Sequence, residues 1–138
     1  RAFIDQARVY RKSLGGGMRQ AGVLAAAGLI ALEKMPARLG EDHANARFLA
    51  AGLAQIPGIA LDASKVMTNI LVFNVAGTGM ISVEICKKLA EKGVLASGID
   101  AEQIRMVTHM DVDRAACARA LEVLRGACGR GNRAGAAD

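Results

Sequence analysis

Apolar residues recur at helical spacing over the first part of the chain. In segment 1–14 they fall three or four residues apart, which predicts an amphipathic helix. Three glycines at 15–17 interrupt this pattern. Residues 18–34 are apolar on nearly all sides, so we expect a second helix that is buried rather than amphipathic. The positions that follow this helical spacing are Phe3, Ile4, Ala7 and Tyr10 or Arg11.

A third helix is expected from Pro36, because proline is well tolerated in the first helical turn. Its apolar stripe repeats at alternating spacings of four and three residues and has one polar member, Asp42. Pro57 and Gly58 end the helix. The stripe consists of Met35, Leu39, Asp42, Ala46, Leu49, Leu53 and Ile56.

Beyond Gly58 the pattern changes to alternating strands and helices. Residues 68–75 are apolar on both faces at their centre, which predicts an interior strand. We expect shorter strands at 59–61, 94–97 and 104–108. A helix with Ile81, Ile85 and Leu89 on its inner face and a last helix capped by Asp111 or Asp113 complete the predicted elements. The stripe of the last helix includes Ala116, Cys117, Ala120, Leu121, Leu124 and Cys128.

This order of elements predicts an α/β (α+β) architecture in three parts. Residues 1–34 form two helices, and residues 35–128 form a small α/β domain whose sheet has three to four strands. Residues 129–138 have no apolar pattern and are expected to form a disordered tail. Because the chain begins within a helical pattern, we expect a fragment of a larger protein.

Composition narrows the classes of function only slightly. The 138 residues carry a net charge of +5, which allows anionic partners, but aromatic residues make up only 3%. Few side chains could therefore stack on bases, and a basic nucleic-acid-binding module is an alternative that we do not favour. The longest apolar run, 23–32, is shorter than the roughly 20 residues that cross a bilayer, so we expect neither a nucleic-acid nor a membrane partner.

The cysteines and histidines point to no special chemistry. Cys86, Cys117 and Cys128 lack CxxC spacing, which suggests reduced thiols in the cytoplasm that pack as small apolar side chains. His43 and His109 with the scattered acids have no metal-ligand spacing, so we expect no metal site.

The glycines at 15–17, between Lys12 and Arg19, are a candidate anion site. Glycine lets backbone N–H groups approach a ligand closely, and the start of a following helix attracts phosphate. The loop is neither a P-loop nor a dinucleotide-binding fingerprint, because both spacings are absent. A flexible turn between helices is the alternative.

Arg105 is the second candidate, because it lies within an otherwise apolar strand. Side chains alternate along a strand, so Arg105, Val107 and His109 should share one face, opposite Ile104, Met106 and Thr108. A guanidinium there requires a partner and binds a carboxylate in a planar, two-pronged manner. A structural salt bridge is the alternative to a ligand carboxylate. His109 is more simply a structural residue than a catalytic one.

Together, four strings resemble the low-specificity L-threonine aldolases over about residues 3–128. These strings are RKSLGGGMRQAG at 11–22, RLGEDHANA at 38–46, TNI at 68–70 and IRMVTHMDV at 104–112. The resemblance implies a fold type I enzyme that uses pyridoxal phosphate. Residues 1–34 would then be C-terminal helices of the large cofactor domain, and residues 35–128 the small domain that closes over it.

The resemblance also implies an activity and site residues. The activity is that of a lyase that cleaves the Cα–Cβ bond of a β-hydroxy amino acid to give glycine and an aldehyde. Arg105 matches the arginine that grips the substrate α-carboxylate. Arg19 matches an arginine that reaches the cofactor phosphate of a neighbouring subunit, and Lys12 a lysine near that phosphate. The intact enzyme would be a homo-oligomer, either a dimer or a tetramer.

One part of the family's site has no counterpart here. No segment matches the motif of the lysine that binds the cofactor covalently, and we identify no catalytic residue in this chain. We therefore expect the chain alone to be inactive. The alternative function is a truncated or degenerate relic, without catalytic activity, that acts, if at all, as an interaction module.

Overall fold

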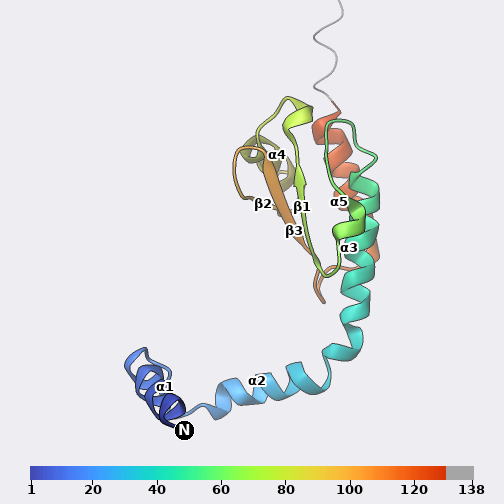
Figure 1. Cartoon of the computed structure of the whole chain (residues 1–138). Coiled ribbons are helices and arrows are strands. Elements are labelled where there is room, and N and C mark those ends of the chain that lie inside the picture. Colours follow the sequence, from blue (N-terminus) through green and yellow to red (C-terminus); the bar gives the residue numbers. More distant parts are fainter. Residues whose placement is uncertain (130–138) are drawn as a thin grey trace, which may run out of the picture. The chain divides into compact units, whose positions relative to one another are not determined.

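The computed structural model describes residues 1–129 and divides into two compact units (Figure 1). The first unit comprises Arg1–Arg38, and the second begins at Leu39. The predicted tail at 129–138 lies outside the described residues except for Gly129, which follows the last helix.

The first unit consists of helices without a core of their own. Helix α1 spans Ala2–Ser13, helix α2 spans Gly22–Glu33, and a short 3-10 helix η1 spans Pro36–Arg38. The predicted start of the second helix at residue 18 is wrong. The N–H of Ala25 bonds to the carbonyl of Ala21, so the regular helical hydrogen bonds begin only there.

The apolar surface of α2 is exposed in this chain. Val23 is 72% exposed, Leu24 66% and Leu32 77%, and neither α1 nor α2 has a buried residue. The sequence predicted that this helix would be buried, but no other part of residues 1–129 covers it. A helix that is apolar on all sides requires cover, because such surface is unfavourable in water.

The second unit contains a three-stranded antiparallel sheet. Strand β1 spans Ile70–Asn74, β2 Ser97–Gly98 and β3 Gln103–Val107, in the order β1-β3-β2. The α/β prediction with three to four strands is thus confirmed. Of the shorter predicted strands, 59–61 is reduced to a single bridge between Ala60 and Asn74, and 94–97 shifts to β2.

The prediction that residues 68–75 form an interior strand is wrong, because β1 lies at the edge and β3 at the centre. Leu71 and Phe73 are buried, whereas Ile70 and Val72 on the opposite face are 48% and 39% exposed. The apolar residues on both faces of β1 indicated that both faces would be buried. In the second unit, however, no helix covers the face that carries Ile70 and Val72.

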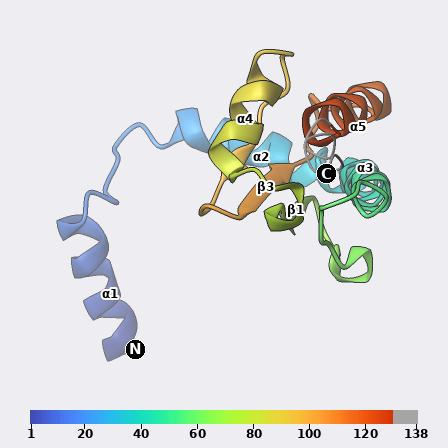
Figure 2. The same cartoon turned by 90° about the horizontal axis from the view of Figure 1, so that it is seen from above.

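Three helices cover the other face of the sheet. They are α3 (Leu39–Leu53), α4 (Ser82–Ala90) and α5 (Arg114–Cys128), with short 3-10 helices η2 (Ala63–Lys65) and η3 (Ala76–Thr78) in the connections. Helices α3 and α5 lie side by side, and α4 also contacts α5 (Figures 1 and 2). The predicted stripes form the core of this unit. Its fully enclosed members include Leu53, Leu71, Phe73, Ile85, Leu89, Ile104 and Leu124.

Candidate functional site

The glycine loop begins by closing α1. The N–H of Gly16 donates to the carbonyl of Arg11 at 2.7 Å and that of Gly15 donates to Lys12 at 3.2 Å. This is the Schellman pattern, which places a left-handed residue after the helix, and Gly15 has φ +84°. The prediction that the loop runs straight into the next helix is therefore wrong. The glycines end α1, and residues 18–21 separate them from α2.

Lys12 lies directly over the glycine backbone. A Cβ atom on Gly17 would fall 2.8 Å from Nζ of Lys12 and 2.6 Å from its Cδ. A side chain at Gly17 would thus occupy the space beside the ammonium group. The loop keeps a cation next to bare backbone, an arrangement that suits an anion.

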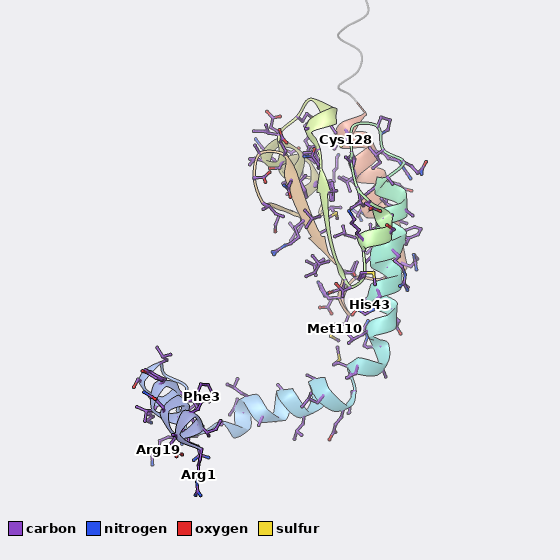
Figure 3. All side chains as sticks on the ribbon, in the orientation of Figure 1. Arg1, Phe3, Arg19, His43, Met110 and Cys128 are labelled. Atoms are coloured by element: carbon purple, nitrogen blue, oxygen red, sulfur yellow. The ribbon has the colours of Figure 1, made fainter. Side chains whose placement is uncertain are left out.

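Arg19 is exposed in the turn that follows the loop, and Figure 3 labels it near α1. Its guanidinium has no hydrogen bond or ion pair with any other residue of the described part of the chain. Lys12 likewise makes no side-chain hydrogen bond within 1–129. The cations at the loop therefore remain available for an external anion.

Arg105 lies at the middle of the open face of the sheet. The register pairs it with Val72 of β1 on one side and with Ser97 of β2 on the other. As predicted, Ile104, Met106 and Thr108 are buried, whereas Arg105, Val107 and His109 are exposed.

The surroundings of Arg105 favour a ligand over a structural salt bridge. Ile70, Val72 and Val107 share its face, so the neighbours of Arg105 on that face include three apolar residues. No carboxylate within residues 1–129 forms an ion pair with it. The predicted alternative of an internal salt bridge therefore finds no partner in the described chain.

Within residues 1–129, His109 lies beside one carboxylate and the three cysteines are free thiols. Nδ1 of exposed His109 lies 3.4 Å from the Asp111 carboxylate, and the two residues are close in sequence. Burial raises the pKa of the Cys86, Cys117 and Cys128 thiols above the ordinary 9.0, which keeps them protonated and unreactive near neutral pH. Among residues 1–129, no three histidine, cysteine or acidic side chains gather as metal ligands.

Strand alternation predicted the buried position of Thr108 but not its hydrogen bond to α3. Thr108 is fully buried at the end of β3, and its hydroxyl donates to the carbonyl of Asp42 in α3 at 2.7 Å. The available signal was a threonine on the face that also carries Ile104 and Met106.

The loop cations and Arg105 belong to different units, the first to Arg1–Arg38 and the second to the unit that begins at Leu39. No helix of the described part is long and apolar enough to cross a membrane.

The sequence is similar to two sets of known proteins. The profile of the beta-eliminating lyase family matches residues 1–76. The low-specificity L-threonine aldolase 1 of Arabidopsis thaliana is 39% identical over 112 residues, which is 80% of this chain and 31% of that protein. The low specificity L-threonine aldolase of Escherichia coli K12 is 40% identical over 114 residues, 83% of this chain and 32% of that protein. The chain thus spans about a third of the length of these relatives.

Solved structures share the fold. A mutant of C-DES with glycine covalently linked to its PLP cofactor superposes with a TM-score of 0.63 at 26% identity, covering 76% of this chain and 28% of that one. Glutamate decarboxylase of Lactobacillus brevis gives a TM-score of 0.56 at 16% identity over 69% of this chain and 24% of that one, which is evidence for the fold alone.

Proposed function

The chain belongs to the beta-eliminating lyase family, and we propose that it forms the C-terminal part of a pyridoxal-phosphate-dependent lyase of the L-threonine aldolase type. The proposed reaction breaks the Cα–Cβ bond of a β-hydroxy amino acid and yields glycine and an aldehyde. The names of the Arabidopsis and E. coli relatives support this class of substrate.

One observation carries the proposal: Arg105 is exposed on an apolar sheet face and has no partner within residues 1–129. We assign it to the substrate α-carboxylate, because a guanidinium donates two parallel hydrogen bonds to that group. Val72 and Val107, exposed on the same face, exclude part of the competing water and strengthen the interaction. Arg105 thus binds and orients the substrate so that the scissile bond is held in one position.

The glycine loop fits the phosphate of pyridoxal phosphate. Lys12 and Arg19 would hold that phosphate, because both are cations without partners in the described chain and Lys12 covers the bare backbone of Gly17. When bound, pyridoxal phosphate supplies an electron sink for the electron pair left on the substrate Cα. Since no lysine here lies in a motif for covalent attachment of the cofactor, we propose that this chain is inactive without the remaining two-thirds of such an enzyme.

The exposed helix α2 supports the proposed assembly. Val23, Leu24 and Leu32 leave a broad apolar surface that a large domain and a second subunit would cover. We therefore propose a homo-oligomer, a dimer or tetramer, in which Arg19 reaches the phosphate of a neighbouring subunit. The three free cysteines support a cytoplasmic location.

The proposed function is tested with a chimera of the E. coli aldolase. In this chimera the whole 138-residue chain replaces the matching third of the E. coli enzyme. We expect the chimera to release glycine from threonine. Removing the Arg105 guanidinium in Arg105→Ala should lower kcat/KM by about 100-fold, the equivalent of losing roughly 3 kcal/mol of charged hydrogen bonding. Arg119→Ala is the matched control, because Arg119 is an exposed arginine of the same unit whose guanidinium donates to the carbonyl of Lys92 at 3.1 Å.

The cofactor assignment is tested separately by pyridoxal phosphate affinity. Arg19→Ala should weaken binding of the free cofactor, whereas Arg8→Ala, which removes an arginine of α1 that pairs with Asp5 at 3.7 Å, should not.

If Arg105→Ala leaves kcat/KM unchanged, the assignment of Arg105 to the substrate carboxylate is wrong. A folded chimera that binds the cofactor but is inactive would favour the catalytically inactive relic.

A further inference from the structure

The end of β3 is fixed by a group of hydrogen bonds around the buried Thr108. The hydroxyl of Thr108 donates to the carbonyl of Asp42 at 2.7 Å, so it joins the strand to α3. The backbone N–H of Thr108 donates to the carbonyl of Asn69 at 2.9 Å, and the side-chain amide of Asn69 donates back to the carbonyl of Thr108 at 2.8 Å. Thr108 therefore connects β3, the residue that precedes β1, and helix α3 at a single point.

The connection that follows β3 is held by the same helix. The side-chain amide of Asn45 donates to the carbonyl of Val112 at 3.0 Å, and the Arg114 guanidinium donates to the carbonyl of Ala44 at 3.3 Å. Figure 3 labels His43 of α3 and Met110, just past β3, at this junction. The first half of α3 thus fixes both the strand end and the chain beyond it.

The chemistry of position 108 differs from that of its neighbours. Ile104 and Met106 occupy the same buried face of β3 and pack as apolar side chains. An apolar residue at 108 would continue that packing, whereas a buried hydroxyl must be hydrogen-bonded to be tolerated. What the hydroxyl adds is direction, because its short bond to the carbonyl of Asp42 links β3 to α3, while the carbonyl of Asn69 lies farther from it, at 3.4 Å.

We propose that Thr108 is a positioning residue for Arg105. This inference rests on the proposed role of Arg105 as the carboxylate-binding group. Arg105 has no side-chain partner within 1–129, so the position of its guanidinium depends on the backbone of β3. Strand β3 is held along its length by β1, and Thr108 anchors its end to the helical layer. Loss of the anchor lets the strand shift and moves the guanidinium away from the position that the carboxylate requires, which weakens binding of the carboxylate.

The test uses the chimera described above and Thr108→Val, which removes the hydroxyl and keeps the shape. We expect KM for threonine and the dissociation constant of glycine, measured by calorimetry, to rise about 10-fold with a smaller change in kcat. Thr108→Ser keeps the hydroxyl and should restore both values. The matched control is Thr78→Val, because the buried Thr78 hydroxyl also donates to a carbonyl at 2.7 Å, that of Val75, but lies in η3 beyond the far end of β1.

A double-mutant cycle separates positioning from general stability. If Thr108 acts through Arg105, Thr108→Val should have little further effect on glycine binding in the Arg105→Ala background. Equal, additive effects in both backgrounds, or equal losses from Thr78→Val and Thr108→Val, would overturn the inference. Unchanged glycine binding in Arg105→Ala alone would instead contradict the proposed function.

A second measurement does not depend on the chimera. In the 138-residue chain, Thr108→Val should speed hydrogen exchange of the amides at 106 and 108, because the end of β3 loses its anchor. The amide at 104, near the other end of the strand, should exchange as before. Exchange at 106 and 108 that is unaltered by Thr108→Val would also overturn the inference.

Discussion

Replacing Gly58 by alanine should destabilise the second unit far more than the same change at Gly79. Both glycines have positive φ, +85° and +73°, so alanine is strained at either position. At Gly79 a new Cβ would meet nothing within 4 Å. At Gly58 it would fall 2.5 Å from the carbonyl carbon and oxygen of Gly77, which are backbone atoms and cannot rotate away. The two positions thus separate backbone strain from close packing of two loops.

The expected magnitudes follow from these two terms. A left-handed alanine costs about 1–2 kcal/mol, which is the whole effect expected for Gly79→Ala. Gly58→Ala adds forced displacement of the 76–79 turn, and such overpacking costs about 1–3 kcal/mol more. For a unit of this size each kcal/mol lowers the midpoint of thermal unfolding by roughly 4–8 °C. We therefore expect Gly58→Ala to unfold at least about 4–8 °C below Gly79→Ala.

Urea and thermal unfolding of the 138-residue chain, followed by circular dichroism, measure this difference. Hydrogen exchange of the β1 and β3 amides assigns the change to the sheet rather than to α1 and α2. The same free energy of unfolding in both variants would refute the close contact between the Gly58 and Gly77 backbones.

Two further predictions concern α5. Asp113→Ala should lower the free energy of unfolding by about 1 kcal/mol in urea titrations, because the Asp113 carboxylate accepts a hydrogen bond from the N–H of Ala116 at 2.7 Å. Asp111→Ala is the control: it leaves this capping bond in place, so the free energy of unfolding should stay nearly the same. Burial raises the pKa of Cys117 and Cys128 above 9.0, so the unfolded chain releases these protons first and stability should fall as pH rises through 9 toward the folded pKa values. The urea midpoint should therefore drop between pH 8 and 10, and by less when both cysteines are alanine; an equal drop would contradict their burial.

The helices of the second unit could be predicted from the sequence because their burial follows a single stripe. The stripe of α3 reaches the core from Asp42 to Leu53 as the spacing indicated, and Asp113 is the cap that the sequence offered as one of two. The position of β1 in the sheet could not be predicted in this way. Ile70 and Val72 are apolar although their face is open, and sequence pattern alone does not distinguish such a face from an interior one.

The site was predicted in part for a similar reason. Strand alternation correctly placed Arg105 opposite Ile104 and Met106, because side-chain direction is a local property of a strand. The role of Gly15 in ending α1 and the bond from Thr108 to Asp42 depend on the path of the backbone. Thr108 and Asp42 lie far apart in the sequence, so no spacing rule connects them.

The central claim, that Arg105 recognises a carboxylate, is tested most directly by comparing two ligands. Glycinamide carries a neutral carboxamide where glycine carries its carboxylate, and calorimetry gives the dissociation constant of each for the chimera. We predict that the unmodified chimera prefers glycine by about 100-fold and that Arg105→Ala abolishes most of this preference. A preference that survives in Arg105→Ala would contradict the account.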